Sequence, residues 1–215
     1  MVRIICLLIG YCFGLFQTSY IYGKMHGIDI RNYGSGNAGT TNALRTLGPK
    51  AGVITFFGDC FKCVFAVLAV HLLFGRMYPD SIRLLAVYAA AGTILGHNFP
   101  FYLKFRGGKG IAATAGLILS FDWRLTLIAL AVFAAVFLIT HYVSLGSLMV
   151  YAVFLIGTLI LGQTGAFVMP REYLYEMYII VALLTVLAVW KHHENIRRLL
   201  SGSERKTYLS SKGRK

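Results

Sequence analysis

Charged residues are scarce in this sequence, and their scarcity argues against an ordinary soluble domain. Only 13% of the 215 residues are charged and only eight residues are acidic, whereas soluble domains carry roughly 25% charged residues. Hydrophobic residues make up 57% of the chain. This composition predicts an all-α protein, a polytopic membrane helical bundle. The net charge of +13 has no soluble basic face to carry it, so we expect membrane lipid as a partner and no nucleic acid.

Several catalytic signatures are also missing, and each absence removes one kind of chemistry. The single CxxC, Cys60 and Cys63, lies in an apolar run with no second pair, so we expect packing, with no metal and no cofactor. The stretch before Lys109 is not a nucleotide-binding P-loop, because Leu103 and Gly110 stand where that motif needs glycine and serine or threonine. No histidine is followed five positions later by an acidic residue, which excludes the acyltransferase mechanism that relies on such a pair. No A-x-A-like cleavage site follows the first apolar run, so no secretory signal peptide is expected.

Long apolar runs dominate what is present, and they predict seven transmembrane helices. Seven crossings place alternate loops on opposite sides of the membrane, with fifteen basic residues on one side and five on the other. The positive-inside rule then predicts that the N-terminus is outside and the C-terminus cytoplasmic. The third, fourth and fifth runs are shorter than the roughly 20 residues that a full crossing needs. The fourth must therefore either borrow from the flanking "FRGGK" or be sheltered by neighbours. The seven segments are 3–23, 51–75, 82–96, 110–120, 124–140, 147–169 and 172–190.

Two charged residues lie inside the second of these segments. Asp59 and Lys62 are three residues apart and therefore share a helix face. Charges within a membrane span usually mark a function or a mutual pair. We expect this pair to support a site rather than to perform chemistry.

The unusual polar stretches all fall on the side predicted to be cytoplasmic. The first, "GSGNAGTTNALRTLG", covers residues 34–48. Its glycines allow positive φ and close approach of backbone N–H groups, and a short helix is expected from Ala38 to a terminating Gly48. A glycine loop that opens into a helix carrying Arg45 is suited to holding an anion. The alternative is a flexible connector followed by a surface helix.

The second stretch, "GHNFPFYLKFRGGKG", repeats this pattern at residues 96–110. Here Gly107 and Gly108 are expected to expose their amides while Lys109 supplies charge. His97 opens the stretch, either as a site residue or as a helix-end residue at an interface.

Two further stretches complete this side of the membrane. In "HYVSLGS", Ser144 and Ser147 are expected to be helix caps. In "KHHENIRRLLSGSE", His192 and Asn195 are three residues apart and Arg198 continues their face. That face is either part of a site or a basic helix attracted to anionic lipid.

Together these motifs resemble the bacterial acyl-phosphate:glycerol-3-phosphate acyltransferases, a family of small seven-span inner-membrane enzymes. "GSGNAGTTN-LR-LG", "GHNFP---KFRGGKGIAAT-G" and "HYVSLGS" with "HHENIRRLLSGSE" match its motifs in order. Cys63 stands where the family has glycine, and His141 and His193 replace arginines. The resemblance implies transfer of a fatty acyl group from acyl phosphate to the sn-1 hydroxyl of glycerol 3-phosphate. The products are lysophosphatidate and inorganic phosphate, and this is the first acylation step of phospholipid synthesis.

The sequence predicts one transmembrane catalytic domain, residues 1–200, followed by a basic cytoplasmic tail, residues 201–215. The residues and the resemblance together give a hypothesis for the site within that domain. His192, His97 and the acyl phosphate itself are alternative acceptors of the hydroxyl proton. Rival hypotheses are covalent catalysis through Ser35, an anion transporter and a lipid-anchored interaction protein. The expected catalytic residues are Ser35, Arg45, Lys109, His192 and Asn195, and the expected substrate-binding residues are Gly36, Asn37, Asn42, His97, Gly107 and Gly108.

Overall fold

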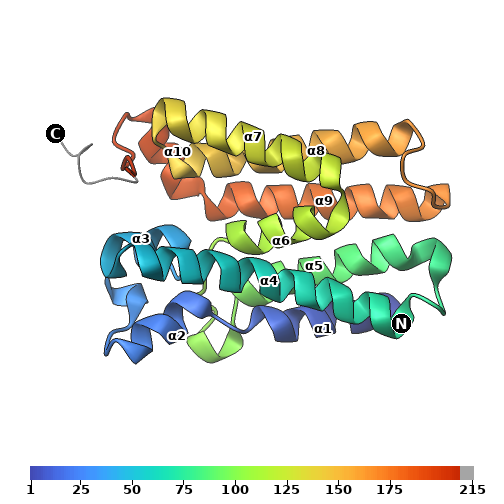
Figure 1. The fold of residues 1–215 in the computed structure, drawn as a ribbon, viewed down its shortest axis with the longest axis horizontal. Helices are drawn as coiled ribbons and strands as arrows, with labels where there is room; N and C mark the ends of the chain where they lie inside the picture. The colour runs from blue at the N-terminus through green and yellow to red at the C-terminus, as the bar shows by residue number, and fades with distance from the viewer. Residues whose placement is uncertain (209–215) are drawn as a thin grey trace.

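The computed structural model describes residues 1–208, which form a bundle of helices with no strand in that range, so the all-α prediction is confirmed (Figure 1). Lys212, Arg214 and Lys215 of the expected basic tail lie outside the described residues. Short 3-10 turns occur at Ile30–Asn32, Pro79–Ser81 and Phe101–Leu103. The helices are α1 (Val2–Gly14), α2 (Thr18–Met25), α3 (Thr40–Leu47), α4 (Pro49–Phe74), α5 (Ile82–Asn98), α6 (Ile111–Phe121), α7 (Trp123–Thr140), α8 (Val143–Gln163), α9 (Arg171–Lys191) and α10 (His193–Leu200).

Six helical stretches among residues 1–208 are long and apolar enough to cross a membrane, and α6 is a shorter apolar helix. Each of the seven predicted segments overlaps one of these. Figure 1 shows the N-terminus at one end of the bundle and α3 and α10 at the other, as an odd number of passes requires. Helix α6 has only 11 residues, and most of them are buried against α4, α5 and α7. It is therefore sheltered by its neighbours, the second of the two alternatives that its length left open.

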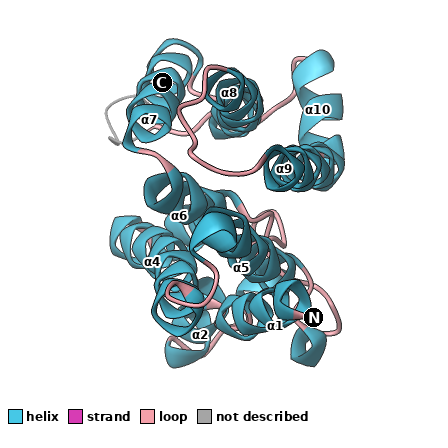
Figure 2. Ribbon diagram, turned by 90° about the vertical axis from the view of Figure 1, so that its right-hand side faces the viewer, coloured by secondary structure: helices cyan, strands magenta, loops and turns pink. Residues whose placement is uncertain are grey.

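The helices form two groups, visible end-on in Figure 2. Helices α1, α2, α4, α5 and α6 form one group, and α7, α8, α9 and α10 form the other. A hydrophobic core that includes Ile94, Leu117, Leu125 and Met177 joins the two. A site contributed by both groups therefore depends on how they pack together.

The first apolar segment is not one continuous helix, which corrects the expectation for residues 3–23. It breaks between Gly14 and Thr18, and the fully buried Gln17 donates its Nε2 protons to the carbonyls of Gly14, Gly96 and His97 at 3.1–3.3 Å. The Lys62 ammonium donates to the Gly14 and Phe16 carbonyls at 3.3 and 2.6 Å. The break is tolerated in an apolar surrounding because neighbouring side chains satisfy the freed carbonyls.

Cys63, the position where the resembled family has glycine, is fully buried against α6. Its partner there is Gly116, where an added Cβ would lie only 2.9 Å from the Cys63 Cβ. The small residue that close packing needs is therefore supplied by α6.

Helices α1 and α5 pack backbone to backbone through two pairs of glycines spaced four apart. Gly10 and Gly14 of α1 face α5, and Gly92 and Gly96 of α5 face α1. A Cβ added at Gly92 would overlap the Leu7 carbonyl and lie 2.8 Å from the Tyr11 nitrogen. Such close contact is how small residues hold membrane helices together.

Gly92→Ala is therefore expected to destabilise the protein by about 1–3 kcal/mol, the usual cost of overpacking. Thermal unfolding of the purified protein in detergent measures the effect. Gly23→Ala is the matched control, because a Cβ there would have its nearest neighbour at 3.3 Å. A melting temperature of Gly92→Ala equal to that of Gly23→Ala would contradict the close α1–α5 contact.

Candidate active site

The first glycine stretch forms a turn that leads into α3. The helix begins at Thr40 rather than at the expected Ala38, and it ends as expected at Gly48, which has φ of 88°. Pro49 follows as the first residue of α4. Gly34 and Gly36 have φ of 62° and 71°, a conformation that glycine adopts without strain.

Asn42 holds this turn in shape from within. Its Oδ1 accepts from the Ser35 amide at 2.9 Å, and its Nδ2 donates to the carbonyls of Ile30 and Tyr33, both at 3.0 Å. The Asn42 side chain is buried, so its amide group stabilises the loop by these three hydrogen bonds and does not face solvent. Ser35 and Gly36 are exposed, and Asn37 is half-buried.

The expectation that Gly107 and Gly108 expose their amides is wrong. The Gly107 amide donates to the Asn98 carbonyl at 3.3 Å and the Gly108 amide to the His97 carbonyl at 3.1 Å. In the first stretch, the Gly36 amide likewise donates to the Tyr33 carbonyl. The loops need their backbone groups for their own folding, so anion binding has to rely more on cationic side chains.

What Gly108 provides is space. An added Cβ would overlap the His97 ring and lie 2.6 Å from the Ala38 carbonyl oxygen. Gly108 of the second glycine stretch therefore packs against Ala38 of the first, and the His97 ring lies beside this contact.

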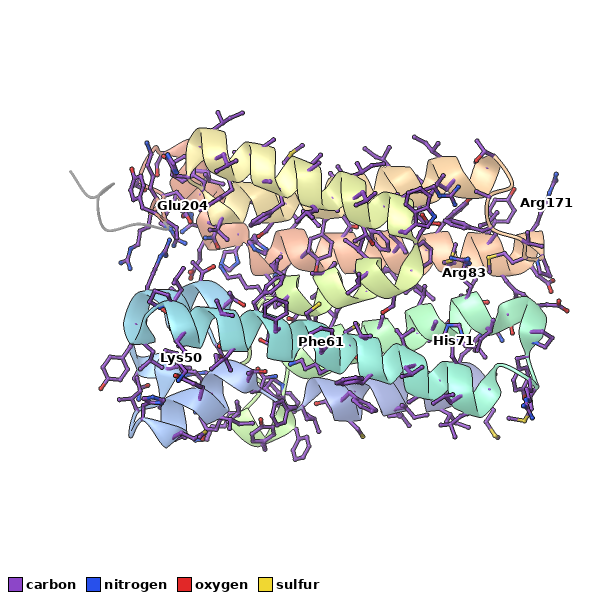
Figure 3. The ribbon with its side chains drawn as sticks, viewed as in Figure 1. Lys50, Phe61, His71, Arg83, Arg171 and Glu204 are labelled. Carbon is purple, nitrogen blue, oxygen red and sulfur yellow. The ribbon has the colours of Figure 1, made fainter. Side chains whose placement is uncertain are left out.

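The two helix groups meet in a polar cluster formed by Lys109, Ser144, Asn195, Arg198 and Glu204, called here the Glu204 cluster. Lys109 donates to the Asn195 side-chain oxygen. Glu204 accepts from Ser144 Oγ at 3.0 Å, Asn195 Nδ2 at 2.8 Å and Arg198 Nε at 2.7 Å. The cluster therefore links the loop before α6 to α8 and α10 at one end of the bundle. Figure 3 shows Glu204 and Lys50 at this end, and Arg83 and Arg171 toward the other.

Arg45 extends this cluster to α3. Its Nη2 donates to the Arg205 carbonyl at 3.1 Å and to Thr207 Oγ1 at 2.6 Å. Thr207 in turn donates its amide to the His141 carbonyl at 2.9 Å. Residues 204–207 thus lie across the site and connect the first glycine stretch to the turn before α8.

Three features here differ from the sequence-based expectations. Ser144 and Ser147 are not helix caps, because Ser144 donates to Glu204 and Ser147 to the Val143 carbonyl four residues earlier. Glu204 and Thr207 were not predicted as site residues. The available signal for Glu204 was that an acidic residue, rare in this chain, falls within a strongly basic segment.

Burial lowers the pKa of two groups at this end, His192 and Lys109. His192 is buried, and its Nδ1 donates to the Ala188 carbonyl at 2.7 Å, which leaves Nε2 as an acceptor. Burial lowers the pKa of His192 to about 4. Burial, with Arg198 nearby, lowers the pKa of Lys109 to about 8. At neutral pH the site therefore holds a neutral imidazole beside a charged ammonium.

The Glu204 carboxylate stays ionised among these cations. Burial raises the pKa of Glu204, but hydrogen bonds from Arg198, Asn195 and Ser144 outweigh it and hold the pKa below the ordinary value. No group of three or more histidine, cysteine, aspartate or glutamate side chains among residues 1–208 is arranged to hold a metal ion.

Of the eleven expected site residues, seven make direct contacts with one another, in three separate sets. Lys109 joins Asn195, Arg45 reaches residues 205–207 beside Glu204, and Gly107, Gly108 and His97 pack on one another. His192 immediately precedes α10, and Asn42 binds Ser35. Gly36 and Asn37 lie on the same turn as Ser35 without a side-chain hydrogen bond to the Glu204 cluster within residues 1–208.

Comparisons with known proteins agree with this architecture. A family model described as glycerol-3-phosphate acyltransferase matches residues 4–202. A glycerol-3-phosphate acyltransferase from Clostridioides difficile is 43% identical over 205 residues, covering 94% of each chain, and one from a Thermoanaerobacter species is 40% identical over 207 residues, covering 96% of each. The crystal structure of PlsY, an integral membrane glycerol 3-phosphate acyltransferase, in its glycerol 3-phosphate form matches with a TM-score of 0.81 at 30% identity, over 97% of this chain and 96% of that chain. The chain therefore belongs to the glycerol-3-phosphate acyltransferase family and is an integral membrane enzyme.

Proposed function

We propose that this enzyme transfers a fatty acyl group from acyl phosphate to the sn-1 hydroxyl of glycerol 3-phosphate and releases lysophosphatidate and inorganic phosphate. One observation carries the proposal most strongly. Lys109, Arg45 and Arg198 converge on one membrane end of the bundle beside a neutral histidine. Both substrates carry phosphate, so this arrangement suits them.

We further propose that the protein lies in the bacterial inner membrane with this end facing the cytoplasm. The loops on the same side as the site carry a threefold excess of basic residues, and such loops face the cytoplasm. Glycerol 3-phosphate would reach the polar end from water, while the acyl chain would lie in lipid.

The reaction needs positioning and charge stabilisation more than a protein nucleophile. The sn-1 hydroxyl attacks the acyl carbonyl carbon, the bond from that carbon to the phosphate oxygen breaks, and phosphate departs. Lys109 and Arg45 would stabilise the charge that builds on the carbonyl and phosphate oxygens. Asn195 would orient the glycerol phosphate. A covalent route through Ser35 has less support, because Ser35 is exposed and no histidine or carboxylate among residues 1–208 hydrogen-bonds its hydroxyl.

His192 is the proposed acceptor of the hydroxyl proton. Its Nε2 carries a free lone pair because Nδ1 donates to the Ala188 carbonyl. Two bound phosphate groups would raise the pKa of His192 from about 4, since opposite charge favours the protonated ring. The ring would then return the proton to the departing phosphate.

The direct test is purified protein in detergent with acyl phosphate and glycerol 3-phosphate, measuring phosphate release and lysophosphatidate. Parallel reactions with acyl-CoA or acyl carrier protein in place of acyl phosphate identify the donor. Formation of lysophosphatidate with acyl phosphate alone supports the proposal. Product formed only from a thioester donor would refute the proposed donor, and no product with any of the three donors would refute the proposed reaction.

The rate is expected to fall as pH rises through about 8. The lowered pKa of Lys109, about 8, means that its ammonium is present below that pH and is lost above it. Above that point kcat/KM should fall about tenfold per pH unit. Lys109→Arg should shift this alkaline limb to higher pH, because guanidinium stays protonated. An alkaline limb that does not move in Lys109→Arg would assign it to another group.

A further inference from the structure

A polar network lies within the membrane span, below the site. Lys62 and Asp59 of α4 have side chains only 4% and 1% exposed, with Nζ and Oδ1 2.9 Å apart. Thr18 Oγ1 donates to the same Asp59 oxygen at 3.0 Å. Lys62 Nζ also lies 2.9 Å from His97 Nδ1. Asp59 and Lys62 therefore form a mutual pair, one of the two alternatives for charges within a span, and Lys62 also contacts His97.

This contact determines which His97 nitrogen carries the proton. An ammonium group only donates hydrogen bonds, so Nδ1 must accept and the proton of the neutral ring must sit on Nε2. The charged groups that face His97 are Lys62 and Asp59 from α4 and Lys191 from α9. Asp59 Oδ1 is 3.7 Å from Nδ1, farther than the ammonium. A ring that accepts from the Lys62 ammonium at Nδ1 is neutral and carries its one proton on Nε2.

The other edge of the ring faces the site. His97 Nε2 has no hydrogen-bond partner among residues 1–208, and it lies against Gly108 beside the Ala38 carbonyl. Because Gly108 has no Cβ, the Nε2 edge of the ring fits against Gly108 and beside the Ala38 carbonyl, where the two glycine stretches meet.

We propose that Lys62 is a positioning residue that holds His97 with its Nε2–H directed at the glycine stretches, where it donates to an anionic oxygen of bound substrate. This inference rests on the proposed function for the identity of that oxygen. It also removes His97 from the candidate proton acceptors, because the free edge of its ring is a donor. His192, with the opposite tautomer, is then the protein group that accepts.

The alternative is that Lys62 only satisfies the carbonyls of the broken first helix. Both roles predict loss of stability when Lys62 is replaced, so stability cannot separate them. The His97 tautomer can, because only the positioning role requires Nε2–H.

The experiment measures the imidazole ¹⁵N resonances of His97 by NMR in wild-type protein and in Lys62→Met, with kcat/KM for glycerol 3-phosphate in both. Wild type should show Nε2–H and a bare Nδ1. In Lys62→Met, the Asp59 carboxylate, 3.7 Å from Nδ1, has lost its cationic partner and should draw the ring proton to Nδ1. The expected loss in kcat/KM is about 10- to 100-fold, the size of effect seen when the hydrogen-bond partner that orients a metal-ligating histidine is removed.

Two further variants keep the test decisive. If Lys62→Met does not fold, the double variant Asp59→Leu/Lys62→Met replaces it, because it also removes the Asp59 charge that the single variant leaves unpaired. With neither charge beside the ring, His97 should show both tautomers. Arg3→Met/Glu176→Gln removes an ion pair of 2.6 Å at the opposite end of the bundle and should change neither tautomer nor kcat/KM. Wild-type protein with Nδ1–H, or a folded Lys62 variant with unchanged tautomer and kinetics, would overturn the proposal. The His97 tautomer is measured without substrate. An inactive wild-type protein would therefore refute the proposed function without affecting the test of Lys62 as a positioning residue.

Discussion

Lys109→Met is expected to lower kcat/KM for acyl transfer to glycerol 3-phosphate by about 100-fold or more, the usual effect of removing one group that stabilises transition-state charge. Lys109 lies in the loop before α6, and its bond to Asn195 crosses to α10 in the other helix group. Lys109 is half-buried, and this burial lowers its pKa to about 8. In a site of low dielectric, a single ammonium stabilises a phosphate more strongly than it would in water.

Lys50→Met is the matched control for this variant. Lys50 lies at the same end of the bundle and is exposed (Figure 3), so its loss removes the same charge without touching the Glu204 cluster. Lys109→Arg should keep part of the activity, because it keeps the charge while changing the geometry. Activity of Lys109→Met within about twofold of wild type would rule out a charged contact with substrate, since such contacts contribute roughly 1.5–3 kcal/mol.

The fold was predictable because a membrane-spanning helix can be recognised from the length of its own apolar run. The apolar runs that became α4, α8 and α9 are long enough to be recognised without tertiary information. The break near Gln17 was not predicted, because it depends on Lys62 of α4 and the carbonyls of α5. The one local clue was a glutamine within an otherwise apolar run.

The site was predictable in its members more than in their roles. The glycines, Lys109 and Asn195 stood out by composition, yet Lys109 and Asn195 are 86 residues apart and only packing of the two helix groups joins them. The roles of Gly107 and Gly108 could not be read from the sequence, because glycine serves equally well to expose an amide or to leave space. In the structure both amides donate to backbone carbonyls. The absence of a side chain at Gly108 lets the His97 ring and the Ala38 carbonyl pack against it.

The close packing around Gly108 predicts a second large effect, the loss of activity when a side chain is added at this position. An alanine Cβ would collide with the His97 ring on one side and with the Ala38 carbonyl, 2.6 Å away, on the other. The ring is fixed by Lys62 and the carbonyl belongs to the backbone, so neither neighbour can move without displacing a loop.

Gly108→Ala is therefore expected to lower kcat/KM by about 100-fold, because a shift of about 1 Å in a positioning loop has effects of that size. The protein should remain folded, since Gly108 does not have positive φ and the collision is confined to the site. Gly23→Ala, whose Cβ would be 3.3 Å from its nearest neighbour, should retain wild-type activity and the same melting temperature. The comparison is made on kcat/KM at saturating acyl phosphate with glycerol 3-phosphate varied. Near-normal kinetics in Gly108→Ala would mean that the two glycine stretches separate without affecting catalysis, and the contact between His97, Gly108 and Ala38 would then have no part in the reaction.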